Sequence, residues 1–317
     1  MTMPASSSDQ QANGVTARDQ KIVPHLWFDE QAEEAVAFYT SVFPDARRGT
    51  ETRYSEEGRE IHGRPPGSVM TVEFELAGTR FMALNGGPHF RFNPSISFFV
   101  HCDSIGEVDR LWAQLSEGGV ALMELDSYDW SDRYGWVQDR FGVSWQVMHT
   151  VAQQRRRRLV PSLLFTGEEP QAQAAMELYT EVFPDSRIEA TFPHPAGGPL
   201  EGMIAHAQFT LFGEPFVAMD GGAVHPFTFN EAISLLVECE DQDEIDRYWE
   251  RLGEGGDPRA QQCGWLKDRF GVSWQIAPRA LGRMLVDPDR SKVDRVIRAF
   301  MPMKKLDLAQ LEAAYRG

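Results

Sequence analysis

The chain has 317 residues, of which 42% are hydrophobic and 25% are charged, and its formal net charge is −16. This length suits two domains better than one, and the acidity argues against a nucleic-acid partner because phosphate binding needs a basic face. The three cysteines form no CxxC pair and no apolar run is long enough to span a bilayer, so we predict a cytoplasmic protein with reduced thiols and no membrane partner.

The predicted elements begin after a polar N-terminal segment that is rich in small residues. Residues 1–20 lack the apolar stretch of a secretory signal, and we predict that they form a disordered tail. Apolar spacing then predicts one unit with a strand at 23–28, a helix at 32–43 and strands at 69–76 and 80–84. A second unit has a strand at 96–100, a helix at 104–116 and strands at about 121–125, 135–139 and 144–148.

The chain then repeats this pattern. The motif Asp-Arg-Phe-Gly-Val-Ser-Trp-Gln occurs at 139–146 and again at 268–275, and the Tyr-Thr-x-Val-Phe-Pro-Asp segment at 39–45 recurs at 179–185. Matches of this length in the same order indicate a duplicated domain. The interval from Gly119 to Asp139 corresponds to that from Gly256 to Asp268, so the second copy is eight residues shorter there.

These matches divide the chain into two domains of class α+β, each built from tandem βαβββ modules. We expect each copy to form one curved sheet with helices on its convex side and a cup on its concave side. The predicted organisation is a tail at 1–20, a first domain at 21–152, a linker at 153–158, a second domain at 159–280 and a C-terminal helical extension at 281–317. Within the extension, a helix is predicted at 291–301 and Asp307 is predicted to begin another as its N-cap.

The motifs of both copies resemble the vicinal oxygen chelate superfamily, and within it the PhnB-like (3-demethylubiquinone-9 3-methyltransferase-like) group. The resemblance rests on the Pro-His-Leu-Trp-Phe run at 24–28, Phe38-Tyr39, the Asn-Gly-Gly at 85–87, Ile96-Ser97 and the duplicated eight-residue motif. It implies two glyoxalase/bleomycin-resistance-like domains but does not select a reaction, since members isomerise, oxidise, conjugate or only bind.

Metal-dependent relatives place ligands at the start of the first strand, at the start of the fifth strand and on the eighth strand. The resemblance assigns these positions to Val23, Ser95 and Gln146 in the first copy, and to Val160, Ala232 and Gln275 in the second. Valine and alanine cannot coordinate a cation, and a neutral amide is a weak ligand. We therefore predict no metal site and no cofactor. A shift in the alignment of the first strand would bring in His25, so a divalent metal stays open as an alternative.

His25 is the candidate catalytic residue. It alternates with Leu26 and should face the cup together with Trp27, where an imidazole could serve as an acid or base. The alternative is a hydrogen-bonded wall residue. Because the second copy has Ser162 at this position, His25 chemistry would belong to one domain only.

The candidate ligand-binding residues are polar or aromatic side chains that the predicted strands and loops place at the cup. They are Trp27, Ser97, Gln146, Asn85, Trp130 and Gln275. Trp130 lies in the segment 126–134, which the second copy lacks in full and which could be a lid or a plain hairpin. Because the first copy keeps both His25 and this segment, its cup is predicted to be the working site.

Four functions follow as alternatives, and one of them is a purely structural role in which the cups are filled by their own side chains, in the first copy by Phe81, Phe90, Phe92, Phe98 and Phe99. The other three involve a ligand or a reaction. The first is a small-molecule-binding protein without a metal. The second is a glyoxalase-type lyase, isomerase or transferase with His25 as acid or base. The third, a methyltransferase as the family label implies, is less favoured because no glycine-rich dinucleotide-type loop follows a strand. The predicted partner is a small-molecule ligand, and the two copies should pair within one chain as a monomer, with a homodimer as the alternative.

Overall fold

The computed structural model describes residues 20–151 and 157–317. Most of the predicted tail and linker lies outside these residues. The first copy contains β1 (Ile22–Phe28), α1 (Ala32–Val42), β2 (Arg47–Arg53), α2 (Arg59–His62), β3 (Val69–Leu76) and β4 (Thr79–Asn85), followed by β5 (Ile96–Cys102), α3 (Ile105–Leu115), β6 (Val120–Tyr128), β7 (Ser131–Gln138) and β8 (Ser144–His149). Each half is therefore a βαβββ unit, although β2 has no counterpart among the strands that the apolar spacing predicts.

The second copy repeats these elements with one loss. It contains β9 (Leu159–Thr166), α4 (Ala172–Val182), β10 (Arg187–Pro193), β11 (Ile204–Leu211) and β12 (Glu214–Gly222), followed by β13 (Ile233–Cys239), α5 (Gln242–Gly253), β14 (Trp265–Lys267) and β15 (Ser273–Pro278). A short 3-10 helix at Pro258–Ala260 replaces the strand that corresponds to β6. This is the position of the eight-residue deletion.

The strand order corrects the expectation that each copy forms its own sheet. The seven-stranded sheet A runs β14-β15-β13-β1-β4-β3-β2, and the eight-stranded sheet B runs β10-β11-β12-β9-β5-β8-β7-β6. Each sheet thus combines one βαβββ unit from each copy. Antiparallel pairs join the units, with His25 opposite Ser234 in sheet A and Ser97 opposite Ser162 in sheet B.

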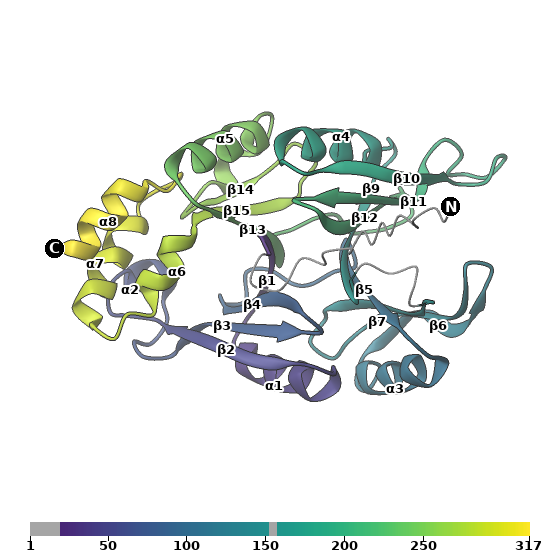
Figure 1. Cartoon of the computed structure of the whole chain (residues 1–317), viewed down its shortest axis with the longest axis horizontal. Helices are drawn as coiled ribbons and strands as arrows, with labels where there is room; N and C mark the ends of the chain where they lie inside the picture. Colours follow the sequence, from purple (N-terminus) through teal and green to yellow (C-terminus); the bar gives the residue numbers. More distant parts are fainter. Residues whose placement is uncertain (1–19, 152–156) are drawn as a thin grey trace, which may run out of the picture.

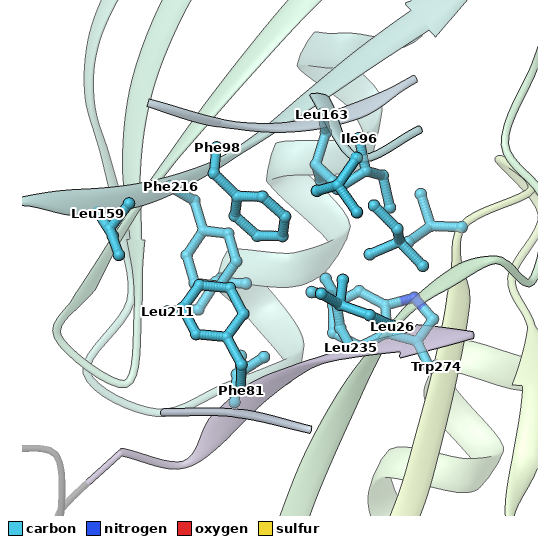
Figure 2. Close-up of a cluster of buried hydrophobic side chains, with 14 of the residues drawn as sticks. Leu26, Phe81, Ile96, Phe98, Leu159, Leu163, Leu211, Phe216, Leu235 and Trp274 are labelled. Carbon is cyan, nitrogen blue, oxygen red and sulfur yellow. The ribbon is translucent and has the colours of Figure 1, made fainter. Parts of the chain in front are cut away.

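The two sheets bend in opposite directions and pack back to back. In Figure 1 each sheet curves like a U, with α1 and α3 along one side of the molecule and α4 and α5 along the other. Alternation along each strand sends one set of side chains into the shared core between the sheets. Figure 2 shows Leu26 and Phe81 of sheet A meeting Ile96 and Phe98 of sheet B, and the rings of Phe81 and Phe98 lie 5.1 Å apart.

We call the concave faces cup A and cup B, after their sheets. They open toward opposite ends of the molecule, and α2 together with α6 (Arg279–Leu285), α7 (Arg290–Phe300) and α8 (Leu308–Arg316) lies at the open side of cup A (Figure 1). The Asp307 carboxylate accepts a 2.9 Å hydrogen bond from the Gln310 amide, which confirms the predicted N-cap.

The C-terminal extension contacts both copies. The amides of Cys263 and Gly264 donate to the carbonyls of Met303 and Lys304, each at 2.7 Å, which fixes the extension to the second copy. On the other side, Arg298 donates to Glu57, next to α2 of the first copy, at 2.9 Å. The extension therefore bridges the two arms of sheet A.

Candidate functional site

In cup A, His25 is held by side chains of the second copy. The ring is buried, its Nδ1 lies 2.7 Å from Nε2 of Gln275, and it meets the ring of Trp265 edge-on at 5.8 Å. The same Gln275 amide nitrogen donates to the Ser234 hydroxyl at 2.9 Å. The predicted site residues His25 and Gln275 are thus brought together, although they belong to different copies.

Burial decides the protonation of His25. Removal from water disfavours the imidazolium and lowers the pKa of His25 from 6.5 to about 3, so the ring is neutral at pH 7. Because the Gln275 NH2 group can only donate, Nδ1 of this neutral ring must accept and the proton resides on Nε2. His25 is therefore set up as a fixed hydrogen-bonding group, and its basicity is poorly matched to proton transfer near neutral pH.

Cup B contains the same glutamine–serine pair but differs from cup A in the residues around it. Nε2 of Gln146 donates to the Ser97 hydroxyl at 2.9 Å, and the Gln146 carbonyl oxygen accepts from the Tyr134 hydroxyl at 2.6 Å. The position of His25 is taken by Ser162, which pairs with Ser97 and Val217 across the sheet. Ser162 is fully buried and its hydroxyl has no hydrogen-bond partner among the described residues. A buried polar atom without a partner is uncommon in native structures.

The walls of cup B are apolar and rich in aromatic and methionine side chains. The floor includes the nearly buried residues Phe99, Tyr134, Val160 and Val217, and the partly buried residues packed on them are Met123, Tyr128, Trp136, Met148 and Met219. The rings of His206 and His101 also contact Phe99, with centroids 5.9 and 6.0 Å away. Burial lowers the pKa of His206, so this ring adds no positive charge to the cup near neutral pH.

The segment 126–134 forms the end of a hairpin that extends from cup B. Tyr128 ends β6 and Ser131 begins β7, with Trp130 in the turn between them. Trp130 is 60% exposed and stacks on Tyr128 at 4.9 Å, while Tyr134 packs edge-on against both rings. The segment is a hairpin with an aromatic tip, and its role as a lid stays a prediction.

The predicted site residues therefore separate into two groups. His25, Trp27 and Gln275 belong to sheet A, whereas Ser97, Gln146 and Trp130 belong to or adjoin sheet B. The expectation that the working cup belongs to the first domain alone is corrected, because the first copy supplies only half of each sheet. The sequence places Ser162 at the position of His25, but neither Ser162 nor Phe99 was among the predicted ligand-binding residues; the alternation that leaves Pro161 and Phe98 on the opposite face was the available signal.

Asn85 has a structural role instead of the predicted ligand contact. Its carbonyl oxygen accepts from the Ala32 amide at 2.8 Å, and its NH2 group donates to Glu33 at 2.6 Å and to the Val69 carbonyl at 3.1 Å. In the second copy, Asp220 accepts from the first amides of α4 in the same way. Both side chains cap a helix from a neighbouring strand, since α1 and α4 have no cap of their own.

The side chains of cup A do not fit the metal site that the superfamily implies. The residues beside Gln275 are His25 and Ser234, two positions along from the Val23 and Ala232 that the sequence alignment assigned to ligand positions. This set offers one imidazole, one hydroxyl and an amide that directs its NH2 group at the other two. It carries no negative charge to offset dehydration of a cation. Within the described residues, no three His, Cys, Asp or Glu side chains lie together as a metal site would require.

Trp27 is fixed at the end of β1 by a close glycine contact. Its indole N–H donates to the Gly87 carbonyl at 2.8 Å, and a Cβ added at Gly86 would lie 2.2 Å from the indole. Gly86→Ala must therefore displace Trp27, and we expect a loss of about 1–3 kcal/mol in the free energy of unfolding, measured by urea denaturation. Gly106→Ala, in helix α3, is the control. Nothing lies within 4 Å of its added Cβ, so the free energy of unfolding should be unchanged or increased. Equal effects of the two substitutions would contradict the contact.

No helix among the described residues has the length and apolar character needed to cross a membrane.

Comparisons with known proteins agree with the duplicated architecture. The sequence profile of the family described as 3-demethylubiquinone-9 3-methyltransferase matches twice, at residues 20–148 and 157–277. Glyoxalase I from Zea mays shares the fold, with a TM-score of 0.53 and 10% identity over 83% of this chain and 93% of its own. A single-residue variant of that enzyme gives a TM-score of 0.54 at 10% identity over the same shares of the two chains.

Shorter proteins match about two fifths of the chain. A Bacillus cereus protein whose description includes the name PhnB is 36% identical over 41% of this chain and 100% of its own, with a TM-score of 0.38. No curated protein matches the sequence. The family description refers to a methyltransferase, but the profile match concerns family membership. The chain belongs to the 3-demethylubiquinone-9 3-methyltransferase family, the PhnB-like branch of the vicinal oxygen chelate superfamily, with two copies fused in one polypeptide.

Proposed function

We propose that this protein binds a small molecule in cup B, the concave face that the second unit of the first copy and the first unit of the second copy build together. The observation that carries the proposal is the Ser162 hydroxyl, which is buried at the base of this face without a hydrogen-bond partner among the described residues. A ligand that supplies a polar atom there would satisfy the hydroxyl and remove the penalty of leaving it unpaired.

The walls favour a flat and largely apolar ligand. The partly exposed ring of Trp136 packs with the buried rings of Phe99 and Tyr134, and Met123, Met148 and Met219 have flexible thioethers that adapt to irregular shapes. Binding sites of this kind typically combine apolar walls with a few placed polar groups. Gln146 and Ser97 already bond to each other, so Ser162 is the group with capacity for a ligand.

Charge around the cup favours a cationic ligand. Glu124, Asp126 and Asp129 lie on or next to the hairpin beside Trp130, and within the described residues none of the three forms an ion pair. Exposed ring faces and unpaired carboxylates both attract a cation. We therefore infer that cup B takes a flat, apolar compound with a positive charge and one hydrogen-bonding group.

The test compares the two equivalent positions of the cups. Binding of cationic aromatic dyes such as ethidium and rhodamine 6G to the purified chain is measured by fluorescence anisotropy. Ser162→Ala should lower the affinity for the dye that binds by about three- to tenfold, the effect of one neutral hydrogen bond. Phe99→Leu should lower this affinity further. His25→Ala, the matched substitution in cup A, should leave the affinity unchanged. A dye that is lost in His25→Ala and retained in Ser162→Ala would contradict the assignment to cup B.

A glyoxalase-type reaction in cup A is the second candidate. It is favoured by the buried His25, whose Nε2–H can donate to a substrate oxygen, and by the C-terminal extension at the open side of this cup. The low pKa of His25 argues against the role of general base at neutral pH, which is why binding is the leading proposal. Turnover that disappears in His25→Ala while substrate binding persists would favour the enzyme.

The same structure supports a monomer as the proposed assembly. Both sheets contain strands from both copies, so neither cup needs a second chain for completion. A small-molecule ligand stays the proposed partner, and a cytoplasmic location stays a prediction from the sequence.

A further inference from the structure

A separate cavity of about 420 Å³ lies in the first copy, where the end of β1 approaches the β7–β8 turn and the β4–β5 loop. Its lining includes the aromatic residues Trp27, Phe28, Phe90, Phe92 and Phe141 and two arginines, Arg91 and Arg140. This volume lies within the range of sites for drug-sized ligands. None of the cup B residues discussed above lines this cavity, so it is a second site with its own chemistry.

Within residues 20–151 and 157–317, no carboxylate forms an ion pair with Arg91 or Arg140. The Arg140 guanidinium lies 4.3 Å from the centre of the Phe38 ring and 5.0 Å from that of Phe141. Ring faces hold a guanidinium without using its N–H groups, so these donors are available to a ligand.

The carboxylates in the cavity wall are already occupied. Asp29 pairs with Arg64 at 3.2 Å. Asp139 is buried and accepts hydrogen bonds from the Tyr39 hydroxyl, the Trp145 indole and the amides of Phe141 and Val143. In a protein with a formal net charge of −16, this cavity therefore presents two guanidiniums and no free carboxylate.

The second copy provides a natural comparison. The repeat aligns Arg91 with Thr228, Trp27 with Leu164, and Gln138 with Lys267, which pairs with Glu231 at 2.8 Å. Arg140 corresponds to Arg269, which likewise lies over a phenylalanine, Phe270, at 5.1 Å. The combination of two arginines with the tryptophan thus belongs to the first copy alone.

We propose that this cavity binds a small organic anion that carries an aromatic group. A guanidinium binds carboxylate or phosphate oxygens through paired hydrogen bonds, and Arg91 with Arg140 would hold the anionic end in this way. Trp27 and Phe90, whose rings meet edge-on at 5.0 Å, would contact the aromatic part. A carboxylate and a phosphate ester share this chemistry, and the experiment separates them.

The experiment is calorimetric titration of the purified full-length chain with 1-naphthoate, 1-naphthyl phosphate and neutral 1-naphthol. At least one anion should bind with 1:1 stoichiometry, at least about tenfold more tightly than naphthol, and more weakly as NaCl rises. The anion that binds identifies the carboxylate or the phosphate ester as the preferred group. Arg91→Thr and Arg140→Ala should each weaken it by about ten- to a hundredfold, the range for charged hydrogen bonds.

Two control variants make the result specific. Arg269→Ala removes the equivalent arginine of the second copy and should change the affinity less than about twofold, and Ser162→Ala should leave the anion unaffected because it lies in cup B. Thermal unfolding checks that every variant is folded. The proposal is overturned if neither anion binds at 1 mM, if both arginine variants bind like the parent, or if Arg269→Ala weakens binding as much as Arg140→Ala.

Discussion

Replacing His25 with glutamine is expected to reduce the loss of stability that the protein shows in acid. The pKa of His25 is about 3 in the folded chain and 6.5 when exposed. Between these values the unfolded chain binds the proton more tightly, so the free energy of unfolding falls as the pH drops from about 6.5 toward 3. At about 1.4 kcal/mol per pKa unit, the full effect is at most about 5 kcal/mol. Urea denaturation at a series of pH values measures it.

The comparison must use the difference between the parent and His25→Gln, because Glu214 has the opposite effect. Burial raises the pKa of Glu214 to about 7, so this carboxyl destabilises the fold as the pH rises from about 4.5 through 7. Between about pH 4.5 and 6.5, the effects of His25 and Glu214 on the free energy of unfolding therefore partly cancel. Glu214→Gln should therefore steepen the loss of stability in acid within this window, and His25→Gln should reverse it. Parallel pH profiles for the parent and His25→Gln would show that the histidine is not buried as described.

The second large effect concerns the buried aspartates of the duplicated motif. Asp268 accepts hydrogen bonds from the Tyr179 hydroxyl at 2.7 Å, from the Trp274 indole at 2.8 Å, and from two backbone amides. Asp139 has the same four kinds of partner in the first copy. Asp139→Ala or Asp268→Ala leaves a buried hydroxyl and indole unpaired, and we expect each to lower the free energy of unfolding by about 3–5 kcal/mol.

Each of the two substitutions should shift one unfolding transition that involves the whole chain. The largest buried cluster contains Trp145 and Trp274 together with residues of both sheets, so the copies share one core. Urea unfolding of each variant, followed by tryptophan fluorescence and by circular dichroism, should give coincident curves shifted by similar amounts. Asp129→Ala, at an exposed aspartate that forms no ion pair within the described residues, is the control and should not shift the midpoint. Two separate transitions, with only one displaced by Asp139→Ala, would contradict the shared core.

Much of the fold was predictable because its signal is local. Repeated motifs gave the duplication, and apolar alternation placed β3 at its observed bounds and most other elements within a few residues. β2 was missed because Arg47–Arg53 contains only polar residues and glycine, so it has no alternating pattern. α2 and α6 are short and have no side-chain cap of their own, which leaves little for a sequence argument to detect.

The exchange of units between the sheets was not predictable from the same signals. β5 and β13 are equivalent strands with similar apolar sequences, so β1 could pair with either, and the sequence contains no local preference. The prediction of the candidate site was wrong for this reason. It assigned His25 and Gln275 to separate cups, although the two side chains are hydrogen-bonded to each other. Asn85 was misjudged for a related reason, since a cap supplied from another strand is visible only in three dimensions.

The exchanged sheets also constrain how the chain is made. β1 pairs with β13, whose residues 233–237 leave the ribosome long after residues 22–26, and β5 must wait for β9 in the same way. A nascent first copy therefore exposes two unpaired strand edges that match another first copy as well as its own second copy. Because the two copies are fused, the strands of the second copy are at high local concentration near the unpaired edges of the first copy. This favours pairing within one chain over pairing between neighbouring nascent chains. The duplicated gene thus replaces a concentration-dependent assembly step with an intramolecular one, at the expense of slow, long-range strand pairing during folding.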